Sequence, residues 1–224
     1  MPALSDYLEQ NLLDEVFNKV DFTGPSTYIA LFTTPLGDDG TGGTEVSGGA
    51  YARVQVHENG SVSTPKWNLA AAEGEHYVVD NAGEVAFAEA TADWGMVKGF
   101  GVYDAASSGN LLYHGPLASS PVPFCGLATD DTLYAKAHGR SNDERVVFKG
   151  VDGRALPSGL SENTEYYVIN ATTDNFQVSA SQGGAAVTLS ADGDGLVFLS
   201  KWQDVRTGNT LKFAAGDFDC RLGG

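Results

Sequence analysis

Cysteine is scarce in this sequence, with only Cys125 and Cys220 among 224 residues. Two thiols are too few for a disulfide framework, and neither belongs to a CxxC pair that could hold zinc. Because free cysteines are among the most buried residues in proteins, we expect two buried thiols. Spacing alone leaves open a bridge between them, which would tie the last strand to the middle of the chain.

Basic residues are also few. The chain has 13 Lys and Arg against 29 Asp and Glu, which gives a formal net charge of −16 and a pI of about 4.4. Its cationic residues are scattered singly, so an acidic surface would repel a phosphate backbone. This charge excludes nucleic acid as an expected partner. The excess of acids favours solubility and says little about the fold.

Long hydrophobic runs are missing as well. No stretch approaches the roughly 20 consecutive apolar residues that a membrane-spanning helix needs. The opening residues, MPALSDYLEQ, contain acids and no basic start. We therefore expect no secretory signal, no membrane partner, and a product that is assembled in the cytoplasm.

Glycine and short apolar runs, in contrast, are abundant. The chain holds 28 glycines, and its hydrophobic fraction of 42% suffices for a packed core. Short apolar runs alternate with Gly, Asp, Asn, Ser and Pro, which is typical of an all-β chain with many turns. We predict a mainly β fold: an antiparallel β-sandwich or barrel-like domain with one N-terminal amphipathic helix, plus an inserted small β-domain.

The clearest local unit is a hairpin within residues 91–117. Residues 97–103 form an apolar run broken only by glycines, which allow close approach of the backbone. Residues 104–110 supply turn chemistry, and residues 111–114 resume the apolar run. The loop carries no cluster of acids, bases or nucleophiles. We therefore expect this hairpin to be a scaffold.

One amphipathic helix is predicted near the N-terminus. Ser5 suits the N-cap, and Asp6 places a negative charge in the first turn, where it complements the helix dipole. Apolar residues then follow at helical spacing, namely Leu8, Leu12, Leu13, Val16, Phe17 and Val20. We expect this face to cover one side of a sheet, and the alternative is that it docks onto a partner protein.

Short strands are expected along the rest of the chain. Before residue 128 they lie at 27–33, 51–56 and 85–87. Beyond it they follow more closely, at 145–149, 165–170, 176–179, 187–189 and 196–199. The last two, at 210–213 and 218–222, should rejoin the first domain. We therefore predict a discontinuous β domain, 1–127 with 200–224, and an inserted β-module, 128–199.

Acidic residues provide two weak candidates for a metal site. Asp38, Asp39 and Glu45 lie in or near a glycine-rich loop and could offer oxygens to calcium, but they lack the regular spacing of a calcium loop. Asp192 and Asp194 flank a glycine, which is more typical of a tight turn. We assign no metal-binding, cofactor-binding or catalytic residue, and we expect no cofactor.

Catalytic signatures are also missing. His57, His76 and His114 are spread singly, so spacing predicts neither a metal triad nor a nucleophile–base pair. The sequence has no nucleophile elbow and no acid pair of fixed spacing. We expect that the protein is not an enzyme.

Aromatic residues allow two interpretations. Trp94 is most simply a core or corner residue. Tyr166, Tyr167 and Phe176 could form a platform on which a glycan stacks, but aromatic residues in strands more often belong to the core.

Four segments carry a resemblance to a known family. They are the opening helix with TYIALFTT, GGTEVSGGAYAR at 42–53, FGVYDAASSGNLLYHGPL at 100–117, and TGNTLKFAAGDFDCRL at 207–222. In these segments and their order, the chain resembles small structural proteins of tailed-bacteriophage virions, commonly labelled tail fibre or minor structural proteins. The resemblance covers most of residues 1–125 and 201–224. It implies a virion component that is assembled in the host cytoplasm.

The chain departs from that family in one place. Family members pass from the LLYHGPL-like strand to the TLKFAAGD-like strand through a short loop, whereas a long segment intervenes here. Within it, DTLYAKAHG, VVFKGVDGRALPSGL, TEYYVINATTDNFQVSAS and GGAAV resemble a β-module that recurs in other phage tail and fibre proteins. The resemblance implies an insertion, which costs little loop entropy at a hairpin tip.

Two functions remain open. The compact length favours a non-enzymatic protein on the particle exterior, a head decoration or cement protein that binds and stabilises the lattice. The alternative is a tail fibre or tail-associated host-recognition protein that binds a receptor or glycan. Expected partners are the major capsid protein or tail proteins, with a host surface glycan under the alternative. A symmetric homo-oligomer is also expected, with a trimer as one candidate.

Overall fold

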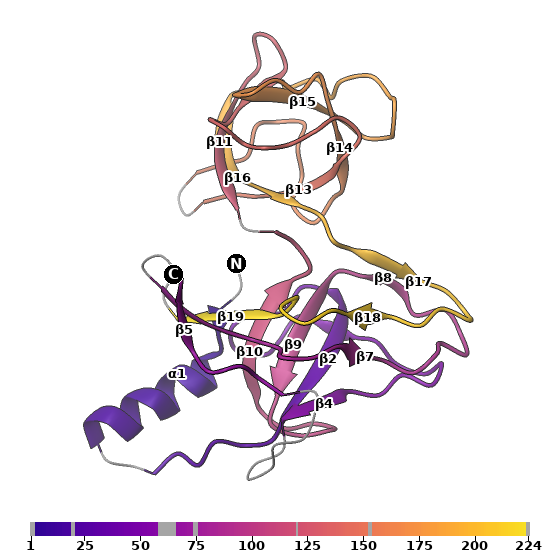
Figure 1. The fold of residues 1–224 in the computed structure, drawn as a ribbon. Coiled ribbons are helices and arrows are strands. Elements are labelled where there is room, and N and C mark those ends of the chain that lie inside the picture. The colour runs from indigo at the N-terminus through magenta and orange to yellow at the C-terminus, as the bar shows by residue number, and fades with distance from the viewer. Residues whose placement is uncertain are drawn as a thin grey trace. The chain divides into compact units, whose positions relative to one another are not determined.

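The computed structural model describes residues 3–18, 21–57, 66–73, 76–119, 121–151 and 154–222, and these residues are mainly β (Figure 1). The predicted fold class is confirmed, including a short helix near the N-terminus and a closed barrel. The chain divides into two units. Unit 1 is Met1–Leu117 with Trp202–Gly224, and unit 2 is Ala118–Lys201.

Unit 1 contains the helical segment and several antiparallel sheets. Its helix α1 is Asp6–Leu13, followed by a π-helical turn, Asp14–Asn18. The largest sheet has the order β1-β10-β9-β2-β3, and β4 also pairs with β2. Its strands are β1 (Ala3–Leu4), β2 (Thr27–Thr34), β3 (Thr44–Glu45), β4 (Val54–His57), β9 (Gly99–Tyr103) and β10 (Leu111–Pro116).

Three smaller sheets complete unit 1. Each of them pairs a strand from the last part of the chain with a strand from the first part. Their orders are β17-β8, β18-β7 and β19-β6-β5. The strands are β5 (Ala71–Glu73), β6 (His76–Asp80), β7 (Val85–Ala86), β8 (Gly95–Val97), β17 (Gln203–Val205), β18 (Lys212–Phe213) and β19 (Asp219–Leu222).

The predicted hairpin is present as β9 and β10, which pair in antiparallel register. Asp104 closes the loop, because its carboxylate accepts hydrogen bonds from the Asn110 backbone N (2.7 Å) and from Asn110 Nδ2 (2.7 Å). Glycine is required inside β9, since a Cβ on Gly101 would lie only 2.9 Å from the Tyr103 ring. The sequence predicted a close approach of the backbone, which the structure shows at Gly99, where a Cβ would lie 3.0 Å from Gly115 O; at Gly101 the close neighbours are side chains.

The core of unit 1 is built around β2 and a group of aromatic rings. Residues 29–32 of β2 are buried without alternation. Trp94 is also buried, in edge contact with the Tyr51 ring at 5.4 Å. Phe218, which is fully buried, packs against Phe100 with ring centroids 4.8 Å apart. The C-terminal segment thus completes a core that begins near the N-terminus.

Unit 2 is a closed antiparallel barrel with the strand order β11-β12-β15-β14-β13-β16. Closure pairs every strand on both sides and removes the exposed sheet edges. The strands are β11 (Val122–Leu127), β12 (Thr132–Tyr134), β13 (Arg145–Lys149), β14 (Tyr166–Ile169), β15 (Asn175–Ser179) and β16 (Gly193–Leu199). Its interior is filled by apolar side chains, among them Leu133, Val146, Val168, Phe176 and Val197.

The boundaries of the predicted module differ from those of unit 2. The structure begins unit 2 at Ala118 and ends it at Lys201, rather than at residues 128 and 199. β11 accounts for the earlier start, because it pairs with β12 on one side and with β16 on the other. The expected strand at 187–189 is not one of the barrel strands. Val187 instead donates one backbone hydrogen bond to Val178 O at 2.7 Å.

Candidate binding surface

The N-terminal helical segment begins where the sequence predicted. Ser5 has an extended backbone, and its Oγ accepts a hydrogen bond from Leu8 N at 3.2 Å. This satisfies one of the free amides of the first turn. The Ser5 hydroxyl also donates to Leu111 O in β10. One buried side chain therefore caps α1 and fastens it to the largest sheet.

Further contacts hold the same end of α1. Asp6 N donates to Asp38 O at 3.1 Å, and His114 Nε2 of β10 lies 2.6 Å from Asp38 Oδ1. Leu8 and Leu12, one turn apart, are half-buried, and α1 contacts β10. The first half of the helical segment is thus fixed to unit 1.

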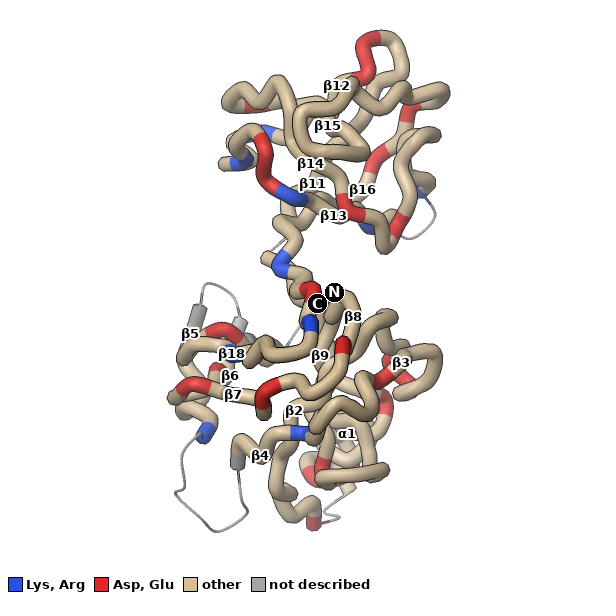
Figure 2. Tube along the Cα trace, turned by 90° about the vertical axis from the view of Figure 1, so that its right-hand side faces the viewer, with Lys and Arg blue, Asp and Glu red and all other residues tan. Residues whose placement is uncertain are grey.

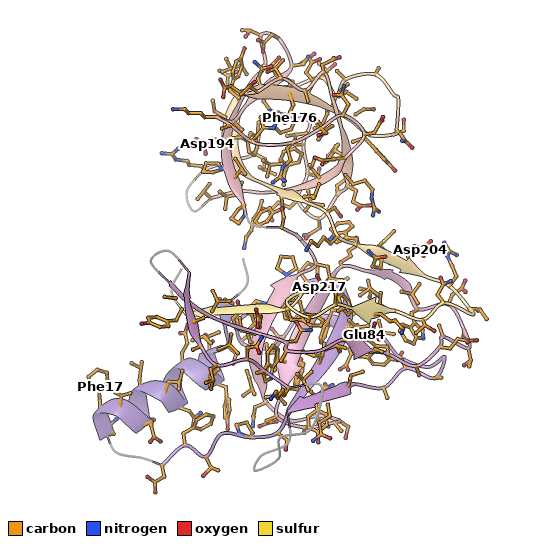
Figure 3. The ribbon with its side chains drawn as sticks, in the orientation of Figure 1. Phe17, Glu84, Phe176, Asp194, Asp204 and Asp217 are labelled. Atoms are coloured by element: carbon orange, nitrogen blue, oxygen red, sulfur yellow. The ribbon has the colours of Figure 1, made fainter. Side chains whose placement is uncertain are left out.

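The second half is exposed. The side chains of Leu13, Val16 and Phe17 are 58%, 69% and 76% exposed, respectively. Phe17 lies toward the end of the helical segment and away from the sheets of unit 1 (Figure 3). The expectation that this apolar face covers a sheet is wrong for these three residues, because the segment continues past the strand that holds its start. We call Leu13, Val16 and Phe17 the apolar tip; Val20 lies outside the described residues.

Acids surround the apolar tip. Residues 3–18 include Asp6, Glu9, Asp14 and Glu15 and no Lys or Arg, and Lys19 is the one base that directly follows them in the sequence. Asp14 Oδ1 accepts from Asn18 Nδ2 at 2.6 Å, and the Glu15 carboxylate accepts from Phe22 N. Figure 2 shows Asp and Glu spread over the traces of both units, with fewer Lys and Arg. The tip is therefore an apolar surface with an acidic border.

The residues considered for calcium have other partners. Asp39 Oδ1 accepts from Thr41 N and Thr41 Oγ1 at 2.9 and 2.8 Å, and these bonds lower the pKa of Asp39 below its ordinary value. Asp38 faces His114, and Glu45 pairs with Arg53 at 2.7 Å. Within the described part of the chain, no group of three His, Cys, Asp or Glu could hold a metal ion.

Arg53 lies at the centre of a network of hydrogen bonds that the sequence did not predict. Its guanidinium donates from Nε and Nη2 to Glu45 at 2.8 and 2.7 Å, and it lies 3.8 Å from the centre of the Tyr103 ring. It also donates to Ala105 O and Ser108 O, at 3.0 and 2.7 Å. Burial acts to lower the pKa of Arg53, but the hydrogen bonds and charge of Glu45 outweigh it and raise that pKa. Glu45 is eight residues from Arg53, but the other partners lie about fifty residues further along the chain, so no local motif predicts the network.

Replacing Arg53 by alanine is expected to destabilise unit 1 by about 2–4 kcal/mol, because Glu45 would lose its ionic partner in a half-buried site. Arg53→Lys should recover only part of the loss, since an ammonium cannot pair in bidentate fashion. Arg206→Ala is the control, because Arg206 forms its ion pairs at the surface. Urea denaturation followed by tryptophan fluorescence measures the effect. Equal midpoints for Arg53→Ala and Arg206→Ala would contradict it.

The two histidines whose side chains the structure describes, His114 and His138, lie in different units. His114 is buried against Asp38, and His138 is buried in unit 2, where its Nδ1 accepts from Arg140 N at 2.9 Å. The side chains of His57 and His76 lie outside the described residues. The two described imidazoles belong to different units and act as local structural links.

A polar cavity of about 290 Å³ lies beside the start of α1. Its lining combines acids and aromatic rings with the loop of the β9–β10 hairpin: Ser5, Asp6, Tyr7, Asp38, Asp39, Gly40, Tyr103, Gly109, Asn110 and Leu111. Asp38, Asp39 and Asn110 already bond to protein groups. The cavity thus borders the contacts that fix the helix.

The aromatic residues of unit 2 are mostly core residues. Tyr166 and Phe176 are buried inside the barrel, and Tyr167 is half-buried. The Tyr166 hydroxyl accepts a hydrogen bond from Ser161 N at 3.0 Å. A glycan could not stack on Tyr166 or Phe176 without opening the barrel, so the core interpretation is confirmed for these two.

Asp192 and Asp194 act locally within unit 2. Asp192 Oδ1 accepts from Ala128 N at 2.8 Å, and Asp194 Oδ2 pairs with Arg154 Nη1 at 2.8 Å. The two acids therefore have separate partners.

The cysteines are not bridged. Cys125 is exposed on β11 of unit 2, and Cys220 is half-buried on β19 of unit 1. The expectation of two buried thiols is wrong for Cys125. Its position in β11 points outward from the barrel, while its neighbour Phe124 is buried in the barrel core.

A comparison with family models shows the family of the chain. Residues 3–137 match the family described as podophage GP4 fiber I protein gp80. The chain belongs to this family. The match spans the first segment of unit 1 and the first two strands of the barrel, so a bacteriophage virion component is the correct general interpretation. No curated protein matches the chain.

The family match bears on the two functions left open by the sequence. It names a fibre protein, which favours the tail-fibre alternative over head decoration. It does not extend over residues 207–222, so the resemblance of that segment stays a prediction. Among the described residues, no helix is both long and apolar enough to cross a membrane.

Proposed function

We propose that this protein is a non-enzymatic structural component of the podophage tail fibre apparatus. The family match over residues 3–137 carries the proposal. Its partners are other tail proteins, and it functions as a symmetric homo-oligomer. Unit 1 supplies the part that attaches to the particle, and unit 2 is an inserted module available for contact with a host surface glycan or receptor.

The described side chains support a structural role. Asp38, Asp39, Glu45, Asp192 and Asp194 all bond to groups of the protein itself. These five acids are therefore engaged in contacts that hold the fold.

The separate cores of the two units support the insertion. Unit 2 closes its own barrel around Phe176 and its neighbours, and unit 1 buries Phe218 among rings from both of its chain segments. A module with its own core can be added to a loop without removing a strand from the host domain.

Labelling of intact phage tests the tail location. Antibody raised against the purified protein and coupled to gold should label the tail of negatively stained particles. Antibody against the major capsid protein is the positive control for the head, and particles grown without this protein are the negative control. Label spread evenly over the head would replace the proposal with the decoration role.

A further inference from the structure

We propose that the apolar tip, Leu13, Val16 and Phe17, docks into an apolar groove bordered by lysine and arginine side chains on another protein of the virion. This inference rests on the proposed function, in that it requires the protein to be attached to the particle. It goes further by naming the attachment surface and the chemistry of its partner.

The apolar tip stands out because its large apolar side chains are exposed to solvent. Eight large apolar side chains are exposed among the described residues, and half of them, including the apolar tip, lie between Tyr7 and Phe17. Exposed apolar residues gathered in this way mark interaction sites, whereas single ones are ordinary. A helix that inserts one face into a groove uses residues spaced by three and four, as Leu13, Val16 and Phe17 are.

The way the helical segment is held supports attachment through the tip. Ser5 fastens the start of α1 to β10, and Asp6 fastens it to Asp38. The apolar residues of the segment are exposed from Leu13 onward, and Phe17 lies toward its far end (Figure 3). A surface that is rigidly held at one end and apolar at the other loses little conformational entropy when a partner covers it.

Charge decides the kind of partner. Residues 3–18 carry four acids and no base, and Lys19 directly after them leaves the segment with a formal excess of acids. Two copies that met tip to tip would bring acids near acids, and like charges across an interface are costly. Basic side chains around an apolar groove would instead pair with this border and speed association. The occupant is therefore a different, basic surface rather than a second copy.

Binding to particles tests the proposal. Phage carrying an amber codon in this gene yields particles without the protein, and fluorescently labelled full-length protein is added to them and co-sedimented. Wild-type protein should bind, and Phe17→Asp should weaken binding about tenfold or more. Leu69→Asp is the matched control, because Leu69 is 92% exposed and lies outside the helical segment. It should bind like wild type.

A second variant tests the charge of the border. Glu9 is exposed and precedes Leu13 and Val16 by four and seven residues, so it lies on their side of the helix. Glu9→Lys should weaken binding several-fold and reduce its dependence on salt. Glu89→Lys makes the same change in net charge at an exposed site elsewhere in unit 1. It should leave the binding to particles and its salt dependence unchanged.

The outcomes separate this inference from the proposed function. If wild type and Phe17→Asp bind particles equally, the apolar tip is not the attachment surface, although the protein remains a virion component. If the wild-type protein itself fails to bind particles, the docking model is wrong. The position of the protein on the virion is then decided by gold labelling alone. If Phe17→Asp lowers the protein's own mass in sedimentation, the occupant is a second copy and the inference is overturned. Unchanged circular dichroism would establish that the variants are folded.

Discussion

Replacing Phe176 by alanine is expected to destabilise unit 2 by about 3–5 kcal/mol, because the ring is fully buried in the barrel and its loss leaves a cavity. The ring packs 4.9 Å from the His138 imidazole, and Phe176 pairs with Leu133 of β12. Few other side chains could move in to fill the space inside a closed barrel. This substitution should have one of the two largest effects in the chain.

The two units allow this effect to be localised. Trp67, Trp94 and Trp202 all lie in unit 1, so tryptophan fluorescence reports that unit alone. Hydrogen exchange of peptides from residues 122–199 should become much faster in Phe176→Ala, while the fluorescence midpoint in urea stays constant. Phe176→Leu keeps most of the volume and should cost only about 1 kcal/mol. Equal exchange in wild type and Phe176→Ala would refute the prediction.

Replacing Phe218 by alanine should destabilise unit 1 by about 3–5 kcal/mol. The side chain is fully buried, with its ring centroid 4.8 Å from that of Phe100 and 4.5 Å from that of Phe213. Its backbone N also donates to Asn81 Oδ1 at 3.0 Å. One residue near the C-terminus therefore joins strands from both chain segments of unit 1.

Tryptophan fluorescence in urea measures the loss. The midpoint should fall in Phe218→Ala, while hydrogen exchange in unit 2 stays as in wild type. Phe17→Ala makes the same chemical change at a side chain that is 76% exposed, and it should leave the midpoint unchanged. A midpoint that moves equally in both variants would show that residues 202–222 do not complete the core of unit 1.

Local patterns in the sequence predicted many elements well. The strand expected at 145–149 is β13 with the same bounds, and the strand expected at 27–33 is β2 with one further residue. Ser5 caps α1 as predicted. These features depend on neighbouring residues: an apolar run favours a buried strand, and a hydroxyl before a helical pattern favours a cap.

Local patterns could not predict contacts between residues that are far apart in the sequence. Residues 122–127 form a strand of the barrel because their partners are β12 and β16, and the latter lies about seventy residues away. Arg53 acquires its role from Glu45, Tyr103 and the loop after β9. Its neighbours in the sequence carry no sign of that network.

The sequence by itself determined that the protein is mainly β, is acidic, has a capped helix near residue 5, and resembles a phage virion protein. The first three properties follow from composition and short-range periodicity, which do not depend on how the elements are arranged, whereas the resemblance depends on four quoted segments. Only the tertiary structure decided which faces are covered. The helical pattern of Leu8, Leu12, Leu13, Val16 and Phe17 is uniform, yet the first two side chains are half-buried beside β10 and the last three are exposed. Burial depends on where the neighbouring strand ends, and that is a property of the fold rather than of the helix.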